Sequence, residues 1–170
     1  KYQEIELAWK NLKKKASPDE FQSSPATGID PKTFDLVLNH LNQIPEGFKP
    51  TSVIDRLINK NYKDLINAGK LDWALGELLA YGSILVENRD VRFTGEDVKR
   101  GTFSHRHAVF FEAEPNKPYN RLNGIQETQG KFRIYNSLLS EYGVMGFEYG
   151  YSLASPDHLV IWEAQFGDFA

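Results

Sequence analysis

The hydrophobic pattern of residues 131–170 predicts a strand, a helix, a second strand and then an aromatic loop. Residues 131–136 alternate between apolar and polar side chains and are rich in strand-forming residue types. The short apolar run 159–162 is typical of a buried parallel strand. Between these runs, the apolar residues near helical spacing are Val144, Phe147, Tyr151 and, less regularly, Leu153. The region is therefore predicted to form one βαβ unit of an open α/β sheet.

Candidate ligand-binding residues follow both of these predicted strands. Ser140 is a favourable cap for the helix, and Glu141 then lies in its positively polarised first turn. Phe166 and Phe169 follow the second strand with F-x-x-F spacing. Because ligands of open α/β sheets bind at the carboxyl ends of the strands, we expect a site at this edge. The alternatives are a glutamate favoured by the helix dipole alone and an aromatic pair that packs in the core.

Three amphipathic segments upstream are predicted to be helices. Residues 2–16 carry apolar side chains on one side and lysines on the other, whereas residues 17–30 have the composition of a loop. Asp30 followed by Pro31 predicts the capped start of a second helix. The apolar positions expected to pack are Phe34, Val37, Leu38 and Leu41 in this helix, and Val53, Leu57 and Ile58 in a third helix that begins at Ser52.

A long helix over residues 71–86 and a strand over residues 91–94 are predicted next. The strand ends just before Glu96 and Asp97, which we therefore expect at the same sheet edge as Glu141. The core candidates of the helix are Trp73, Leu75, Leu78, Leu79 and Leu85.

Composition excludes several classes of function. The chain has 170 residues, a net charge of −3 and no cysteine. This charge indicates no surface for nucleic acid, and the lysine-rich run 10–15 is better explained as the solvated face of a helix. No apolar run approaches the roughly 18 residues of a membrane span. Without cysteine there is no disulfide and no thiolate metal site, which fits a reducing compartment.

Two long motifs resemble one enzyme family. The chain contains SLLSEYGVMGFEYGYSLASP at residues 137–156, followed by WEAQFGDFA at residues 162–170, and it contains GEDVKRGTFSHRHAV at residues 95–109. These strings resemble the transketolase-like, pyrimidine-binding domain of the thiamine-diphosphate-dependent 2-oxoglutarate dehydrogenases, and the close match covers residues 71–170. These motifs are long and have few alternative residues per position, so the resemblance is specific to this family.

The resemblance implies a fold class and a division of the chain. It implies an α/β fold with a partial parallel sheet in residues 70–170, truncated at its C-terminal side, and a helical connector in residues 1–69. The family binds magnesium and diphosphate through a separate domain with a Gly-Asp-Gly motif, and neither that triplet nor a glycine-rich phosphate loop occurs here. We therefore interpret the chain as an excised fragment that is inactive alone.

The resemblance also assigns roles in cofactor binding to Glu141, Phe166 and Phe169. In the family, the glutamate of the SEYG motif shares a proton with the pyrimidine ring of thiamine diphosphate and stabilises its imino tautomer, which removes the thiazolium proton. Aromatic residues of the final loop pack against the same ring, and stacking suits an aromatic heterocycle. The chain carries matching residues at these three positions.

His105 and His107 are candidates for substrate binding. A 2-oxo dicarboxylate needs charge-assisted donors for its distal carboxylate and polar groups near its keto oxygen. In an extended segment the two histidines would point one way and Arg106 the other. A structural loop with one histidine bonded to the backbone explains the motif equally well, and H-x-H alone is weak evidence for a metal site. Further candidates at the rim, for which mutual pairing is the commoner explanation, are Glu96, Asp97 and Arg100.

The resemblance finally implies a function for a full-length protein. That function is decarboxylation of 2-oxoglutarate and transfer of the succinyl group to the lipoyl arm of a succinyltransferase component, in the tricarboxylic acid cycle. It implies a homodimer in the bacterial cytoplasm or the mitochondrial matrix. The alternatives are a 2-oxoadipate-type dehydrogenase of the same family, which commonly has glutamine at the position of His105, and a non-catalytic assembly module.

Overall fold

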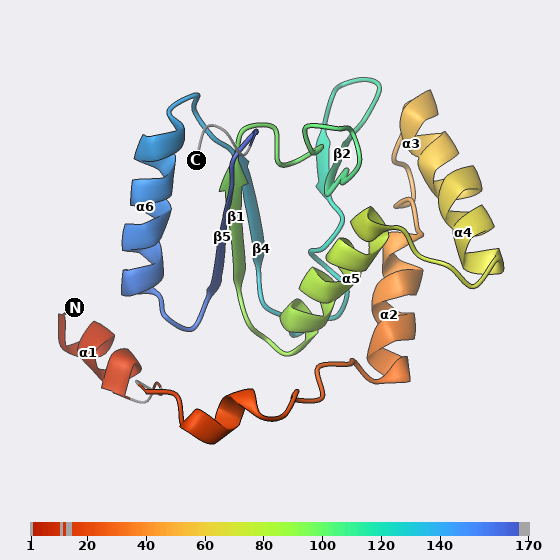
Figure 1. The fold of residues 1–170 in the computed structure, drawn as a ribbon. Helices are drawn as coiled ribbons and strands as arrows, with labels where there is room; N and C mark the ends of the chain where they lie inside the picture. The colour runs from red at the N-terminus through yellow and green to blue at the C-terminus, as the bar shows by residue number, and fades with distance from the viewer. Residues whose placement is uncertain (1, 11, 13–14, 167–170) are drawn as a thin grey trace.

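Helices cover both faces of a small parallel sheet (Figure 1). The computed structural model describes residues 2–10, 12 and 15–166. Within these residues, no helix is both long enough and apolar enough to cross a bilayer. The arrangement is a mixed α/β fold with a partial parallel sheet, which confirms the fold class that the sequence predicts.

The sheet has three parallel strands in the order β4-β1-β5. Strand β1 (Val91–Gly95) is central, and β4 (Phe132–Asn136) and β5 (Leu159–Glu163) pair with it on either side. Helix α6 (Glu141–Ala154) connects β4 to β5. The last residues of all three strands are aligned in the register, so the strands end level at one edge.

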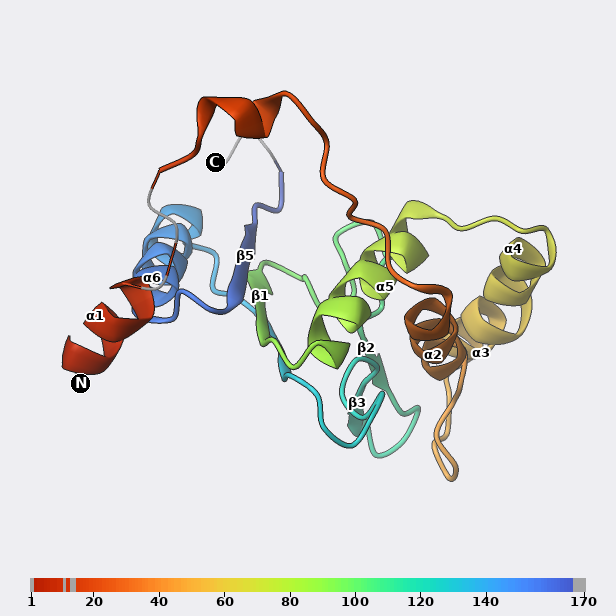
Figure 2. The same ribbon diagram turned by 90° about the horizontal axis from the view of Figure 1, so that it is seen from below.

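Successive side chains of β1 face different helices. Phe93 contacts Tyr81 of α5 (Trp73–Val86), with 5.8 Å between the ring centroids. The neighbouring Arg92 instead forms a bidentate ion pair with Glu148 of α6, at 2.7 and 2.8 Å. Because neighbouring residues of a strand point to opposite faces, α5 and α6 lie on opposite sides of the sheet (Figure 2).

One hydrophobic core extends from the sheet through α5 to the helices before it. Helix α2 (Pro31–Leu41) begins where predicted, since Asp30 Oδ1 accepts hydrogen bonds from two backbone N–H groups of the first turn at 2.9 and 3.1 Å. Gly82 lets α2 approach α5 closely, because a Cβ there would lie 2.3 Å from Cγ1 of Val37. Fully buried members of the core include Val37, Leu41, Tyr62, Leu75, Leu78, Leu85, Val91 and Phe93.

The third predicted helix is one continuous helical stretch with a π-helical middle. It consists of α3 (Ser52–Arg56), the segment η2 (Leu57–Tyr62) and α4 (Lys63–Asn67). The prediction that Val53 packs in the core is wrong, because its side chain is 47% exposed. The residues that face the core lie four apart, beginning one position later: Ile54, Ile58 and Tyr62.

Helix α1 is shorter than predicted. It covers Tyr2–Lys10, whereas the sequence predicted a helix over residues 2–16; of the remaining positions in that range, those that are described (12, 15 and 16) are not helical. Leu7 is 58% exposed, so the apolar side of α1 is not part of the core. The indole Nε1–H of Trp9 donates to the carbonyl oxygen of Leu153 at 2.7 Å, which places α1 beside the end of α6.

Some of the apolar positions predicted to pack on the long helices are exposed. Trp73, the first residue of α5, is 96% exposed, while the later leucines of this helix are buried as predicted. On α6, Phe147 of the predicted apolar stripe is 62% exposed, and the buried residue is its neighbour Glu148. The partner of Glu148 explains this burial, because Arg92 neutralises the carboxylate.

The last strand and one hairpin also differ from the prediction. Strand β5 is parallel as predicted, but it lies at the edge of the sheet and is only partly buried. An antiparallel hairpin formed by β2 (Val109–Phe111) and β3 (Pro118–Asn120) was not predicted. A single turn of 3₁₀-helix, η1 (Pro18–Phe21), lies within the predicted loop.

Candidate active site

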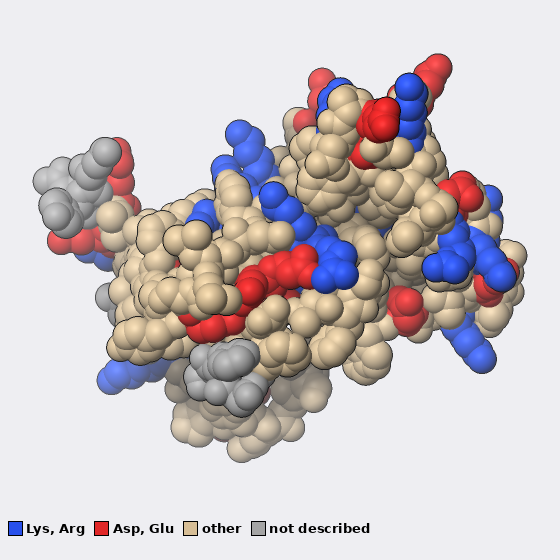
Figure 3. Space-filling model, turned by 90° about the horizontal axis from the view of Figure 1, so that it is seen from above, with Lys and Arg blue, Asp and Glu red and all other residues tan. Residues whose placement is uncertain are grey.

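The predicted site residues that the structure describes lie in or beside the loops at the carboxyl edge of the sheet. The loops that follow β1, β4 and β5 all begin at this edge. Figure 3 looks onto the edge and shows acidic and basic side chains next to one another near the middle of the face, with uncharged residues around them. This is the edge at which open α/β sheets bind ligands.

Glu141 is the first residue of α6 and is partly buried. Its Oε1 accepts a hydrogen bond from the backbone N–H of Gln165 at 3.0 Å. Its Oε2 is buried and has no hydrogen-bond partner among the described residues. Ser140 occupies the cap position, as predicted, but its side chain makes no capping hydrogen bond. One carboxylate oxygen is thus held by the loop after β5, and the other has no partner among the described residues.

The aromatic loop begins directly after this contact. Phe166 follows Gln165 and is 44% exposed, so part of its ring is accessible at the same edge as Glu141. Phe169 lies outside the described residues. The structure therefore brings Glu141 close to the loop that carries Phe166.

His107 lies in a bent segment, not in an extended one. Ser104 and His107 have φ values of 54° and 45°, so the simple alternation expected for an extended chain does not apply. The Nε2–H of His107 donates to the carbonyl oxygen of Ser104 at 3.0 Å and lies 3.1 Å from its hydroxyl oxygen. Burial, together with the charges of Arg121 and Arg100, lowers the pKa of His107, which favours a neutral ring.

His105 packs against the preceding turn. A Cβ at Gly101 would lie 2.5 Å from Cε1 of the His105 ring, and Gly101 itself has a φ of 84°, so only glycine suits this position. The Nδ1 atom of His105 is buried and has no hydrogen-bond partner among the described residues. Among the predicted site residues that the structure describes, His105 and Glu141 each have a buried polar atom with no hydrogen-bond partner.

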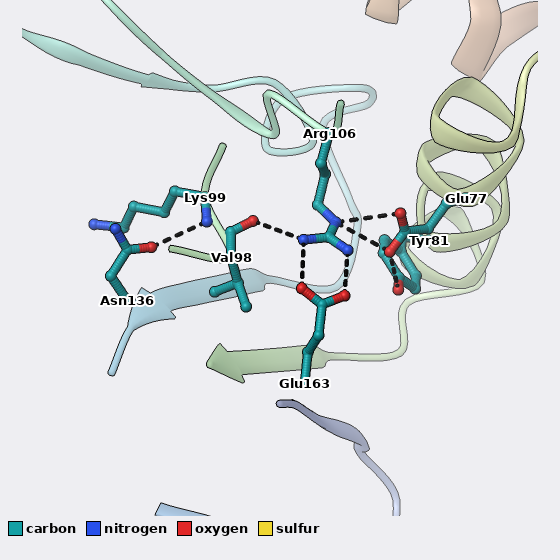
Figure 4. A network of polar contacts seen from close by, with 7 residues as sticks. All are labelled: Glu77, Tyr81, Val98, Lys99, Arg106, Asn136 and Glu163. Atoms are coloured by element: carbon teal, nitrogen blue, oxygen red, sulfur yellow. Dashed lines mark hydrogen bonds and ion pairs between the residues drawn. The ribbon is translucent and has the colours of Figure 1, made fainter. Parts of the chain in front are cut away.

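Arg106, between the two histidines, is buried and bound on several sides (Figure 4). Its Nη2 donates to Glu163 Oε2 at 2.5 Å and its Nε donates to Glu77 at 3.1 Å. Burial alone would lower the pKa of Arg106, but these two carboxylates outweigh it and raise the pKa. Tyr81 donates to Glu77 at 2.7 Å, and burial together with this carboxylate raises the pKa of Tyr81.

The rim charges pair with one another. Asp97 and Arg100 form an ion pair, and the backbone N–H of Lys99 donates to Asn136 Oδ1 at 3.0 Å. Next to them is a cavity of about 460 Å³, whose polar lining includes Asp97, Lys99, Arg100, Ser104, His107 and Asn136. The structure thus connects His107 to a cavity at the sheet edge, while Asp97 and Arg100 neutralise each other.

Sequence reasoning missed three residues that organise the site. Glu77 and Glu163 hold Arg106, and Arg121, which is 1% exposed, donates to the carbonyl oxygen of His107 at 3.2 Å. Arg121 also donates to the carbonyl oxygen of Leu41 at 2.6 Å, which fixes the histidine segment to the end of α2. These residues lie far apart in the sequence, and no local pattern indicates that they meet. Within the described part of the chain, no group of three or more acidic or histidine side chains is arranged to hold a metal ion.

The comparison with protein families agrees with this geometry. Residues 69–170 match the model of the transketolase pyrimidine-binding domain. With its parallel sheet and the glutamate at the carboxyl edge, the chain belongs to the transketolase pyrimidine-binding domain family.

Three similar proteins are named as 2-oxoglutarate dehydrogenases. The chain is 44% identical over 167 residues to a protein of Caenorhabditis elegans named 2-oxoglutarate dehydrogenase, mitochondrial, and this alignment covers 98% of the chain. It is 48% identical over 144 residues to the 2-oxoglutarate dehydrogenase E1 component of Oceanobacillus iheyensis, covering 85% of the chain. The mitochondrial 2-oxoglutarate dehydrogenase of Saccharomyces cerevisiae is 44% identical over 167 residues, or 98% of the chain. The chain spans only 15–16% of the length of these relatives.

Proposed function

We propose that this chain is the pyrimidine-binding part of a thiamine-diphosphate-dependent 2-oxoglutarate dehydrogenase. The observation that carries the proposal is the unpartnered Oε2 of Glu141 at the carboxyl edge of the sheet. A buried carboxylate oxygen without a partner is costly unless a ligand satisfies it. The names of the relatives and the matched family support the same function.

Glu141 is suited to hold the pyrimidine ring of thiamine diphosphate. With Oε1 fixed by the N–H of Gln165, Oε2 is the oxygen that would share a proton with a ring nitrogen. When bound, the cofactor supplies a thiazolium carbon that becomes nucleophilic on losing its proton. Phe166, and Phe169 from the family resemblance, would pack against the ring and orient it, which is worth about 0.5–1.5 kcal/mol per aromatic pair beyond burial.

His105 and His107 are suited to assist the substrate. The unpartnered Nδ1 of His105 offers a hydrogen-bonding group to a 2-oxo acid, whereas His107, whose Nε2–H is used by Ser104, would contribute by lining the neighbouring cavity. A donor placed where negative charge develops on the keto oxygen stabilises the transition state. The site would then hold 2-oxoglutarate, with its distal carboxylate toward Lys99 in the lining of the neighbouring cavity.

The partners of the full-length protein follow from the same proposal. Its succinyl product would pass to the lipoyl arm of a succinyltransferase component in the tricarboxylic acid cycle, and magnesium and diphosphate would be held by residues outside this chain. A homodimer is supported by the large apolar side chains exposed on and before α6, which are Leu138, Leu139, Tyr142, Phe147 and Tyr149. Since the relatives include mitochondrial and bacterial proteins, the compartment would be the mitochondrial matrix or the bacterial cytoplasm.

Two assays of carbon dioxide release test this function. The full-length protein that contains this chain is supplied with thiamine diphosphate, magnesium and either 2-oxoglutarate or 2-oxoadipate. The proposal predicts a higher kcat/KM for 2-oxoglutarate, and a preference for 2-oxoadipate would favour the related enzyme. The 170-residue chain alone is predicted to show no turnover, because it supplies only part of the site. Absence of turnover with both substrates in the full-length protein would support the assembly module instead.

A further inference from the structure

We propose that Arg106 is a positioning residue that holds the substrate-binding segment and the cofactor-binding loop in one fixed arrangement. The inference rests on the proposed function, because it concerns the same two half-sites. It adds a role to the one residue of the S-H-R-H segment that is buried and bound on several sides.

The contacts of Arg106 show that it is not a substrate ligand. Its side chain is 2% exposed. A guanidinium has five N–H groups, and four of them are used here. The N–H of Nε donates to Glu77, and one N–H of Nη2 donates to Glu163. The two N–H groups of Nη1 donate to the carbonyl oxygen of Val98 and to Glu163. The guanidinium also lies 4.6 Å from the ring centroid of Phe93. Four of the five donors are therefore already used, and the 2% exposed side chain is not accessible to a substrate carboxylate.

The same contacts join three separate elements at the sheet edge (Figure 4). Glu163 is the last residue of β5, Glu77 lies on α5, and Val98 lies in the loop after β1. Because a guanidinium is rigid and its fork matches a carboxylate, the bidentate contact to Glu163 fixes direction as well as distance.

A short path leads from Arg106 to the cofactor-activating carboxylate. Glu163 lies two residues before Gln165, whose backbone N–H donates to Glu141 Oε1 at 3.0 Å. On the other side, Arg106 is covalently next to His105 and His107. A displacement of Glu163 would therefore move the Gln165–Phe166 loop against Glu141, whereas a displacement of Glu77 would not act on that loop directly.

This asymmetry gives a matched pair of variants. Glu163→Ala and Glu77→Ala each remove one carboxylate from the same guanidinium and leave it the other. In the full-length protein, Glu163→Ala is expected to weaken binding of thiamine diphosphate and to lower kcat, each by about tenfold to hundredfold. Glu77→Ala is expected to change the Kd of the cofactor by less than about twofold and to raise KM for 2-oxoglutarate.

Both variants are assayed by calorimetric titration with thiamine diphosphate and magnesium, together with steady-state kinetics and Tm. A control, Asp90→Ala, breaks the ion pair with Arg133 at 2.5 Å, at the opposite edge of the sheet, and is expected to keep the Kd of the cofactor. If an alanine variant fails to fold, the pair Glu163→Gln and Glu77→Gln keeps the side-chain shape and gives the same comparison.

The outcomes separate the inference from the function on which it rests. An equal Kd for the cofactor in the two variants, or an unchanged Kd in Glu163→Ala, would overturn the positioning role of Arg106 even if the parent protein is active. A parent protein that binds no thiamine diphosphate would overturn the proposed function itself. A weaker Kd confined to Glu163→Ala, with similar Tm values for both variants, supports the inference, since a purely structural role would affect both alike.

Discussion

Glu141 and Glu148 lie on the same helix and differ in what surrounds them. Glu148 is 3% exposed, and both of its oxygens are bound by Arg92. Glu141 has one oxygen bound by a backbone N–H and one buried oxygen with no partner among the described residues. A satisfied ion pair stabilises the packing of α6 on the sheet, whereas an unsatisfied carboxylate oxygen indicates a place for a ligand.

The partly buried ring of His107 predicts that the free energy of unfolding depends on pH. Burial lowers the pKa of His107, so the unfolded chain takes up a proton first as the pH falls below about 6.5. Neutral His107 therefore stabilises the folded chain fully above its ordinary pKa of about 6.5. This stabilisation is lost as the pH falls toward the lower pKa of the folded state. Urea unfolding is expected to show a smaller loss of stability on going from about pH 7.5 to about pH 5.5 in His107→Gln than in the parent chain. An equal loss in both would contradict the burial of His107.

At the scale of elements, local signals predicted where helices begin but not which face of each helix packs. Asp30 and Pro31 lie beside the residues that they organise, so the start of α2 is readable from sequence. Trp73 and Phe147 are apolar, yet both are exposed, because the side of a helix that meets a neighbour is decided by tertiary packing. The hairpin β2–β3 was missed because its strands have only three residues each and one contains proline.

Helix α5 offers a matched test of its packing. Gly82→Ala is expected to destabilise the chain by about 1–3 kcal/mol, because the added methyl group would meet Val37 of α2. Gly76→Ala on the same helix meets nothing within 4 Å and is expected to be stabilising by about 0.5–1 kcal/mol. Chemical denaturation measures both, and similar values for the two variants would contradict the close approach of α2 to α5.

For the whole molecule, the predicted division at residue 69 stays a prediction. The family match begins at that residue, but the core extends across it, since Val37 and Tyr62 are buried together with residues of α5. The candidate site residues were selected from the sequence only through the motifs that resemble the family, because the position of Glu141 alone is better explained by a helix start. Arg106, Glu77 and Glu163 meet only in the fold, so their contacts were not predictable.

Truncation tests how independent the two parts are. Residues 70–170 alone are expected to unfold at a clearly lower Tm than the whole chain, or to aggregate, because removal of the connector exposes the buried face of α5. Circular dichroism on heating, with size-exclusion chromatography, measures this. A truncated chain with an unchanged, cooperative transition would show that the connector adds nothing to the core.

The most direct test of the account concerns the oxygen of Glu141 that has no partner. In the full-length protein, the rate of hydrogen–deuterium exchange at the thiazolium carbon of bound thiamine diphosphate is measured by NMR for the parent, for Glu141→Gln and for Glu148→Gln as a control on the same helix. Exchange is predicted to slow by about 10²–10⁴-fold in Glu141→Gln and to stay near the parent rate in Glu148→Gln. Exchange at the parent rate in Glu141→Gln, with the cofactor still bound, would contradict the account.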